Sequence, residues 1–279
     1  MKKISRRSFL AAAGLSVAAL ALTACGGSSS SVASSVASSA ASSEAASTSA
    51  AAGELATVEA GKLTMATNAA FPPYEMTTDA GEFEGIDIET AQAIADKLGL
   101  ELQIDDMDFD AALLSVQQGK ADIVMAGVTV TDERKAVMDF SDSYATGIQS
   151  IIVPEGSDIA SPDDLAGKKI GTQRGTTGYI YCSDDFGDDN VVAYDDGLTA
   201  VQALNNGQVD AVVIDNAPAQ EFIAANPGLK ILDTSYAEED YAIGMAKGSS
   251  LEDAVNAALE ELKADGTLQS IVDKYITAE

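Results

Sequence analysis

The sequence predicts an α/β protein with two lobes, each built around a mostly parallel sheet. Two observations lead to this prediction. From about Leu55 onward, short apolar runs typical of buried strands alternate with amphipathic segments typical of helices. In addition, one helix–glycine–strand pattern occurs twice, 88 residues apart. A chain of 279 residues is long enough for one large domain or two modest ones.

The candidate strands are short and mostly continuous in apolar residues, as expected of strands buried on both faces. They are Leu63–Thr67, Leu100–Ile104, Ile123–Ala126, Ser150–Val153, Lys169–Thr172, Val191–Ala193, Ala211–Ile214, Lys230–Leu232 and Ala242–Ala246. Helical spacing appears in Ile88, Ala91, Ala95 and Leu98, followed by Gly99 as a stop signal. A second helical stripe runs from Leu251 to Leu262.

The repeated pattern spans residues 116–127 and 204–215. Each copy has a helix end, a Gly (Gly119 or Gly207), an Asp (Asp122 or Asp210) and then an apolar strand. This similarity indicates two lobes built on one plan, although α/β proteins use such a turn often. The alternative is that the match is a common local motif without wider meaning.

Two such lobes would share one cleft, because ligands of open α/β sheets bind beyond the carboxyl ends of the strands. Asn68, Gly127, the turn 173–177 and Asp215 each follow a candidate strand. We therefore expect these positions to face the cleft together.

Residues 1–24 are predicted to form a lipoprotein signal peptide. Lys2, Lys3, Arg6 and Arg7 form a basic start, and an apolar run follows from Leu10 to Leu22, too short to span a bilayer comfortably. Ser5-Arg-Arg-Ser-Phe-Leu10 resembles the twin-arginine export pattern. Leu22-Thr-Ala-Cys25 resembles a lipobox, which predicts lipidation of Cys25. The alternative is an ordinary secretory signal that ends near a Cys.

Residues 25–54 are predicted to form the lipidated Cys and a disordered tether. Ser, Ala and Gly make up nearly all of residues 26–53, and they bury too little apolar surface to offset the entropy of ordering. A flexible coil of this length spans roughly 30 Å. After the leader no apolar run approaches the length of a membrane span, so attachment to a membrane is expected through lipid only.

The composition excludes several kinds of function. The formal net charge of −28 repels nucleic acid and anionic lipid headgroups. The chain has no His, and its two Cys residues, Cys25 and Cys182, are far apart. A metal site or a disulfide framework is therefore not expected, and no cofactor-binding motif is present. Cys182 belongs to no motif and is expected to be a lone thiol.

The best candidates for ligand recognition are one cation and one anion. Arg134 is one of only two Arg residues after the leader, and it stands where a strand gives way to a helix. It suits a carboxylate ligand group; the alternative is a surface Arg paired with Asp132 or Glu133. Asp215 ends a buried strand and suits an ammonium group. Its alternative is an N-cap for the following helix.

Other candidates offer hydroxyls, amides or apolar walls. Thr129, Thr176 and Thr177 are able to donate to a ligand, or else serve as turn and capping residues. Phe71 and Phe109 are able to form the walls of a pocket; core packing is the alternative for either.

These residues lie in motifs that resemble the family 3 solute-binding proteins, the amino-acid-binding components of ABC transporters. The resemblance covers about Leu63 to Tyr275. The motifs are Ala66-Thr-Asn-Ala-Ala-Phe-Pro-Pro-Tyr-Glu75, Gly85-Ile-Asp-Ile-Glu89, Ala126-Gly-Val-Thr-Val-Thr-Asp-Glu-Arg134, Asp139-Phe-Ser141, Gly175-Thr-Thr177 and Val213-Ile-Asp215. The Ala126–Arg134 motif is the most specific.

The resemblance implies the periplasmic binding protein type II fold and a binding role rather than catalysis. Arg134 with Thr129 and Thr177 would hold the ligand carboxylate, and Asp215 with the Gly127 carbonyl would hold the ammonium. Phe71 and Phe109 would sandwich the side chain. The full set of candidate binding residues is Asn68, Phe71, Phe109, Ala126, Gly127, Thr129, Arg134, Gln173, Thr176, Thr177 and Asp215.

The resemblance also implies two hinge crossovers, near 147–151 and 241–244. Lobe 1 would comprise residues 55–147 plus 242–279, and lobe 2 would comprise residues 148–241. Closure of the lobes on a free amino acid would be the signal to ABC transporter permease subunits. The protein is expected to be a monomer outside the cytoplasm, lipid-anchored at the outer face of a Gram-positive membrane or on the periplasmic side of a Gram-negative one.

The ligand side chain is expected to be polar. Family members that bind cationic or amide side chains often carry Asp where this chain has Asn68, which lowers the expectation for Lys or Arg unless Glu75 substitutes. Arg174 is able to attract an acidic side chain or else points to solvent. Two alternatives remain: a dehydratase-like enzyme on the same fold, and an amino-acid-sensing receptor component.

Overall fold

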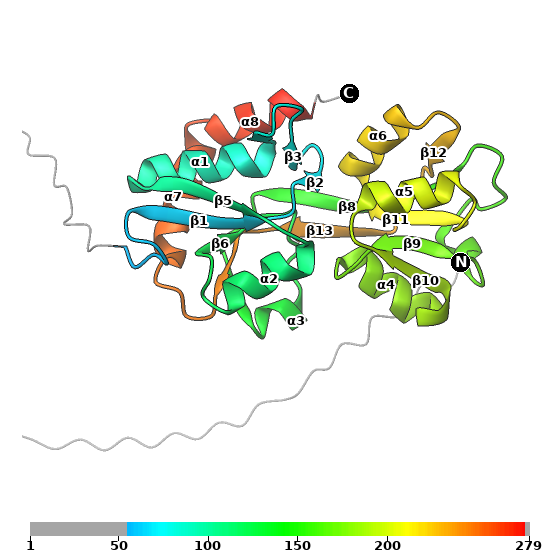
Figure 1. Cartoon of the computed structure of the whole chain (residues 1–279), viewed down its shortest axis with the longest axis horizontal. Helices are drawn as coiled ribbons and strands as arrows, with labels where there is room; N and C mark the ends of the chain where they lie inside the picture. Colours follow the sequence, from blue (N-terminus) through cyan, green and yellow to red (C-terminus); the bar gives the residue numbers. More distant parts are fainter. Residues whose placement is uncertain (1–54, 277–279) are drawn as a thin grey trace, which may run out of the picture. The chain divides into compact units, whose positions relative to one another are not determined.

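A computed structural model of the chain describes residues 55–276 (Figure 1). The predicted signal peptide, Cys25 and tether lie outside these residues. Within them, strands and helices alternate along the chain, as the sequence predicts. None of the helices in this range has both the length and the apolar character needed to cross a bilayer.

The first large sheet has the strand order β5-β1-β6-β14-β7. Its strands are β1 (Lys62–Thr67), β5 (Glu101–Asp106), β6 (Ile123–Val124), β7 (Met138–Phe140) and β14 (Gly244–Ala246). The helices packed with it are α1 (Ile86–Leu98), α2 (Phe109–Gln117), α3 (Asp132–Lys135), α7 (Glu252–Ala264) and α8 (Thr267–Tyr275). We call this sheet and its helices lobe 1.

Both faces of the lobe 1 sheet are buried, because side chains on its two faces pack into two different hydrophobic clusters. Leu63 and Met65 of β1 pack in the cluster formed with α1, α7 and α8, whereas Ala66 packs in the cluster formed with α2. Figure 1 shows α1 and α8 on one side of the sheet and α2 on the other. A small antiparallel sheet of β2 (Ala70–Phe71), β3 (Glu75–Thr77) and β4 (Phe83–Glu84) follows β1.

The second large sheet has the order β10-β9-β11-β8-β12, and β13 also pairs with β8. Its strands are β8 (Ala145–Pro154), β9 (Ile170–Gln173), β10 (Val191–Tyr194), β11 (Ala211–Asp215), β12 (Leu229–Ile231) and β13 (Ala237–Tyr241). Its helices are α4 (Thr177–Phe186), α5 (Gly197–Asn205) and α6 (Asn216–Ala225), with 3-10 turns η1 (Pro162–Leu165) and η2 (Asp188–Asn190). We call this sheet and its helices lobe 2.

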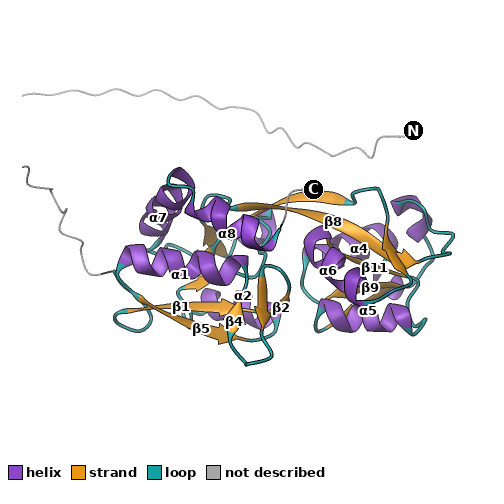
Figure 2. Ribbon diagram, turned by 90° about the horizontal axis from the view of Figure 1, so that it is seen from above, coloured by secondary structure: helices purple, strands orange, loops and turns teal. Residues whose placement is uncertain are grey.

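The chain passes between the sheets twice, in the segment 141–144 and at residues 242–243. Next to these passages, the first half of β8 pairs with β13 in antiparallel register, from Ala145 opposite Tyr241 to Gln149 opposite Ala237. Figures 1 and 2 show this two-stranded ribbon running between the lobes. The crossovers expected near 147–151 and 241–244 fall in or beside the ribbon.

The sheets are mixed, which corrects the expectation that they are mostly parallel. In lobe 1, β1 pairs in parallel with β5 and β6, but β14 is antiparallel to both of its neighbours. In lobe 2, β9 pairs in parallel with β10 and β11, but β8 is antiparallel to all three of its partners. Many of the antiparallel pairs involve strands that adjoin the passages between lobes, where the chain direction is set by the crossing rather than by a helix connection.

The repeated sequence pattern forms the same structure in both lobes. Gly119 and Gly207 end helices with positive φ values of 65° and 68°. Asp122 Oδ2 accepts the amide proton of Thr64 at 2.8 Å, and Asp210 Oδ2 accepts that of Lys169 at 2.8 Å. Each Asp therefore binds the start of the neighbouring parallel strand, β1 or β9, which aligns the strand ends that carry the candidate site.

Candidate functional site

One cavity brings the candidate residues of both lobes together. Its lining consists of Asn68, Phe71, Glu75, Phe109, Ala126, Gly127, Thr129, Arg134, Gln173, Thr176, Thr177 and Asp215. All of the binding residues proposed from the sequence are in this set. Their role in binding a ligand stays a prediction.

The strand ends explain this convergence. Asn68 follows β1 and Gly127 follows β6 in lobe 1, whereas Gln173 ends β9 and Asp215 ends β11 in lobe 2. These are carboxyl ends of parallel strands, which lie at the same edge of a sheet. Gly127 has a φ of 55°, and a Cβ atom there would stand 2.9 Å from the Phe71 ring and 3.3 Å from that of Tyr241. Glycine thus lets the backbone approach the aromatic side chains closely.

Arg134 is a buried cation that reaches both lobes. Thr131 accepts the Arg134 amide proton at 3.1 Å and starts the short helix α3. The guanidinium donates to the Thr129 carbonyl at 2.8 Å and, across the cleft, to the Gly175 carbonyl at 3.1 Å. It also lies 5.4 Å from the centre of the Phe109 ring. Only 8% of Arg134 is exposed, so the alternative of a surface Arg is wrong.

Burial lowers the pKa of Arg134, and the negative charge of Glu239 opposes this shift. A guanidinium remains charged in proteins, so the group keeps its positive charge. Two of its five N–H donors are used by the carbonyl groups. Its other donors are able to bind a carboxylate in the cavity that Arg134 lines.

Asp215 is the buried anion of lobe 2. Its carboxylate accepts hydrogen bonds from the Tyr241 hydroxyl and, at 2.7 Å, from Gln149 Nε2. Burial raises the pKa of Asp215 from 3.8 to about 7, although both donors oppose the shift. Within the described chain, its side chain makes no capping bond to α6. The N-cap alternative therefore does not describe what the carboxylate contacts.

Glu239, which was not predicted from the sequence, contacts two of the three threonines that line the cavity. Thr129 Oγ1 and Thr177 Oγ1 donate to Glu239 Oε2 at 3.0 and 2.9 Å. Gln149 Nε2 also donates to this oxygen, at 3.1 Å. Gln149 therefore links the carboxylates of Asp215 and Glu239. Of the three threonine candidates, only Thr176 has the alternative capping role, because it accepts the Tyr179 amide proton at the start of α4.

Glu75 is a second buried carboxyl group of the cavity. From the sequence, Glu75 is expected only as a substitute for the acid that the family resemblance implies at the position of Asn68. Neither of its oxygens has a hydrogen-bond donor among residues 55–276. Burial, followed by the charge of Asp87, raises the pKa of Glu75 well above its usual range. Asp87 accepts from the Gly127 amide at 3.0 Å and the Tyr144 hydroxyl at 2.7 Å, while burial raises its pKa to about 6.

The remaining polar candidates differ in their contacts and in whether they line the cavity. Gln173 donates to Asn68 Oδ1 at 2.8 Å, which joins lobe 2 to lobe 1, and Asn68 donates to the Met107 carbonyl at 3.0 Å. Arg174 is exposed and pairs with Asp195 at 3.4 Å, outside the cavity lining. Cys182 is buried, and burial raises the pKa of its thiol to about 12.

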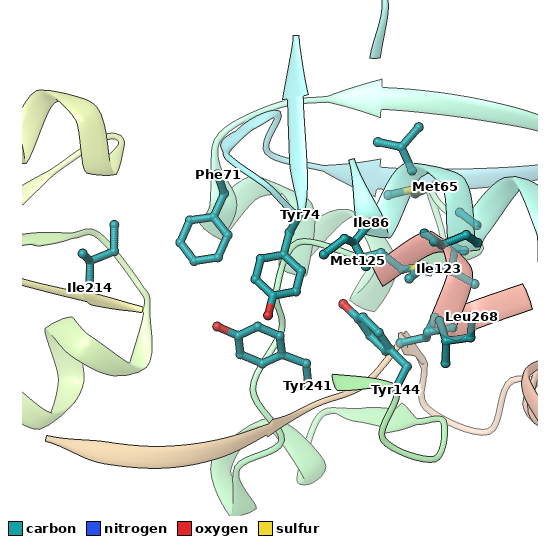
Figure 3. Packing of buried hydrophobic residues seen from close by; sticks show 14 of the residues in the cluster. Met65, Phe71, Tyr74, Ile86, Ile123, Met125, Tyr144, Ile214, Tyr241 and Leu268 are labelled. Atoms are coloured by element: carbon teal, nitrogen blue, oxygen red, sulfur yellow. The ribbon is translucent and has the colours of Figure 1, made fainter. Parts of the chain in front are cut away.

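Aromatic rings separate the cavity from the core of lobe 1. Phe71 stacks near Tyr74 with ring centres 6.0 Å apart, and Tyr74 meets Tyr241 edge to face at 5.2 Å. Figure 3 shows Phe71 beside Tyr74 and Tyr241 below Tyr74, with the Tyr241 hydroxyl directed away from Tyr144. The Tyr144 hydroxyl donates to Asp87, whereas that of Tyr241 donates to Asp215. Phe71 and Phe109 are buried and line the cavity, so both act as its walls as well as packing in clusters.

Three buried polar residues were missed or undervalued: Gln149, Glu239 and Glu75. The signal for Gln149 is a polar residue inside the apolar run of β8. Glu239 lies in the acidic segment Glu238-Glu239-Asp240, whose sequence resembles a solvated turn. No pattern in that segment distinguishes the buried member from its exposed neighbours.

Comparison with known proteins gives consistent matches. The model of the bacterial extracellular solute-binding proteins, family 3, matches residues 63–278. A probable histidine-binding protein of Neisseria gonorrhoeae is 33% identical over 276 residues, which cover 96% of this chain and 95% of that protein.

Solved structures are similar too. An ancestral arginine-binding protein bound to glutamine has a TM-score of 0.75 and 42% identity, covering 79% of this chain and 100% of that chain. An amino acid ABC transporter substrate-binding protein, AbpA of Streptococcus pneumoniae, bound to L-arginine, has a TM-score of 0.73 and 37% identity. That match covers 77% of this chain and 94% of that chain.

Proposed function

We propose that this chain, which belongs to the bacterial extracellular solute-binding proteins of family 3, binds a free L-amino acid between its lobes and delivers it to an ABC transporter. The fold is that of the type II periplasmic binding proteins, as expected. The observation that carries the proposal is the buried pair of opposite charges at one cavity. Arg134 comes from lobe 1 and Asp215 comes from lobe 2.

A zwitterion satisfies both charges at once. Its carboxylate would accept from the unused donors of Arg134 and from the first amides of α4, at Thr177 and Gly178, which precede the helix's own carbonyl acceptors. Its ammonium would donate to Asp215 and to the Gly127 carbonyl. Because an unpaired buried charge is unfavourable, a ligand with both groups is preferred over one with either group alone.

The acidic surroundings favour a polar, and specifically a cationic, side chain. The buried carboxyl groups of Glu75 and Asp215 line the cavity, which has one buried guanidinium. Two more buried carboxyl groups, those of Asp87 and Glu239, accept hydrogen bonds from residues of the lining. Glu75 lines the cavity, and none of the described residues donates a hydrogen bond to its carboxyl group. It would therefore supply the acidic group for a cationic side chain that the amide of Asn68 does not provide. We propose L-arginine as the first ligand to test and L-glutamine as the second, both of which occur in the similar structures.

Residues 1–54 and the movement of the lobes would serve delivery of the amino acid to the transporter. We propose that residues 1–24 direct export, that Cys25 carries lipid and that the segment 25–54 tethers a monomeric binding domain outside the cytoplasm. Residues 55–147 plus 242–279 and residues 148–241 would move about the β8–β13 ribbon. Permease subunits would then recognise the closed form.

A thermal-shift screen of the twenty amino acids, followed by calorimetry, tests the proposal, because a ligand that binds only the folded state raises its stability. We expect a Kd in the micromolar range or tighter for one or a few L-amino acids. Arg134→Ala and Asp215→Ala should each weaken binding by about 3–5 kcal/mol, since each leaves a buried charge unpaired. Arg174→Ala is the matched control, because this Arg is exposed and pairs with Asp195. Unchanged affinity in both site variants, with fold retained, would refute the assignment.

The dehydratase-like alternative is less favoured, because the matched family consists of solute-binding proteins. Incubation of the protein with its tightest ligand for hours, followed by mass spectrometry, separates the two functions. Stoichiometric recovery of unchanged ligand is expected. Loss of water or ammonia from the ligand would indicate catalysis instead.

A further inference from the structure

Glu239 is a buried carboxylate at the junction of both lobes and the ribbon that joins them. It lies on β13, and only 6% of it is exposed. Its neighbours in the chain, Glu238 and Asp240, are exposed. Glu239 does not line the ligand cavity, so a role in binding must act through other residues.

One oxygen of Glu239 receives protons from both lobes. Thr129 of lobe 1 and Thr177 of lobe 2 donate to Oε2 at 3.0 and 2.9 Å, and their own hydroxyl oxygens lie 3.4 Å apart. Gln149 Nε2 donates to the same atom at 3.1 Å. Oε1 has no donor among residues 55–276. The carboxylate thus collects three donors at a single atom.

These hydrogen bonds determine whether the hydroxyls of Thr129 and Thr177 donate to a ligand or accept from it. A hydroxyl has one proton and two lone pairs, and an ionised carboxylate only accepts. Both hydroxyls donate their single proton to Glu239 Oε2. The protons of Thr129 and Thr177 are therefore directed at Glu239. Toward the cavity that both residues line, their oxygens present only lone pairs.

We propose that Glu239 is a positioning residue that turns the hydroxyls of Thr129 and Thr177 into acceptors for the N–H donors of the ligand. The inference rests on the proposed function and refines it: the two hydroxyls serve the ammonium end of the ligand, and the carboxylate end is left to Arg134 and backbone amides. Because the threonines come from different lobes, the same carboxylate also holds them in the closed arrangement.

A double-mutant cycle tests this role. Calorimetry with L-arginine and L-glutamine would compare Glu239→Gln in the wild-type background and in a Thr129→Val, Thr177→Val background. We expect Glu239→Gln to weaken binding at least tenfold in the first background and less than twofold in the second, because the valines leave no hydroxyl to orient. Glu238→Gln, the exposed neighbour on the same strand, is the matched control and should bind as wild type does.

A ligand without the ammonium gives a second readout. Deamino-arginine (5-guanidinopentanoate) keeps the carboxylate and the guanidinium but lacks the α-ammonium. It should bind more weakly than L-arginine, and Glu239→Gln should raise its Kd by less than threefold. If Glu239 had only a structural role, Glu239→Gln would reduce the affinity for both ligands equally, and by the same factor in both backgrounds.

The outcomes are distinguishable. If the wild type binds none of the twenty amino acids, the proposed function fails. If the wild type binds and Glu239→Gln binds equally well, only the present inference is overturned. The same conclusion follows if the loss on Glu239→Gln is as large in the valine background as in the wild type, because the carboxylate would then act by charge or packing alone. Circular dichroism and melting temperature would establish that each variant is folded.

Discussion

The carboxylate of Asp110 on α2 fills the space beside Gly175 in which a side chain at position 175 would have to stand. Its Cγ atom lies 2.6 Å from the ideal Cβ position of residue 175, and Gly175 has a φ of 75°. The two residues belong to different lobes. On its other side, Gly175 accepts a hydrogen bond from Arg134 at 3.1 Å. Glycine at this position therefore allows the two lobes to meet here.

Gly175→Ala should weaken ligand binding at least tenfold, because the added methyl group meets Asp110 only when the lobes are closed. Asp110→Ala in the same chain should restore most of the affinity, which calorimetry would measure. Gly187→Ala is the matched control: φ is 84°, but no described atom lies within 4 Å of the added Cβ. It should cost about 1 kcal/mol of stability from the backbone conformation and leave affinity unchanged. Equal affinity losses in the Gly175 and Gly187 variants would contradict the closure contact.

Binding should become tighter as pH rises from 5 to 7 and level off above. Burial raises the pKa of Asp215 from 3.8 to about 7, and only its ionised form pairs with an ammonium. Calorimetry at one-unit pH steps should show Kd falling by up to about tenfold per unit in this range. Without ligand, the folded protein binds more protons than the unfolded chain between pH 4 and 7. The contribution of Asp215 to the free energy of unfolding therefore falls as pH rises through that range.

Asp215→Asn serves as the control for this pH profile. The variant should bind weakly at every pH and lose most of the pH dependence. Asp87 has its pKa raised to about 6, and that of Glu75 is raised well above its usual range, so these carboxyl groups could titrate nearby. A steep profile that persists in Asp215→Asn would assign the dependence to the Glu75–Asp87 pair instead.

Glu75→Gln should change ligand preference rather than abolish binding. The substitution removes a carboxyl group that lines the cavity and has no donor within residues 55–276. Affinity for L-arginine should fall at least tenfold, whereas affinity for L-glutamine should change by less than threefold, because only a cationic side chain beside Glu75 lowers its raised pKa and pairs with the ionised carboxylate. Calorimetry with both ligands measures the ratio, with the exposed Glu82→Gln as control. A parallel loss for both ligands would argue against a role of Glu75 in selecting charge.

The two Asp residues of the repeated motif should differ in their contribution to stability. Asp122 is 6% exposed and accepts the amide protons of Val58 and Thr64 at 2.7 and 2.8 Å, whereas Asp210 is exposed and accepts that of Lys169. Asp122→Ala should lower the free energy of unfolding by about 3 kcal/mol and Asp210→Ala by about 1 kcal/mol. Urea unfolding would measure both. Equal losses would mean that burial of the carboxylate does not determine the difference.

The predicted order of helices and strands is largely confirmed where local patterns are strong. The apolar runs became β1, β5, β6, β9, β10 and β11, and Gly99 ends α1 in the left-handed conformation as expected. By contrast, β13 was missed, because its sequence Ala-Glu-Glu-Asp-Tyr has neither a clear apolar alternation nor a buried run. Its place as a strand depends on pairing with β8, which is a long-range contact.

The strand pattern of the sequence predicts that Asn68, Gly127, the turn 173–177 and Asp215 gather at one cavity, because the carboxyl ends of parallel strands share one edge of a sheet. Which acids of the chain are buried at this cavity depends instead on contacts between segments that are distant in the sequence. Glu239 and Glu238 are neighbours of the same type, and the pairing of β13 with β8 places one against Thr129 and Thr177 and the other in solvent. Hydrogen bonds between lobes depend on how two separate sheets are placed relative to each other, and no local pattern along the chain encodes that distance.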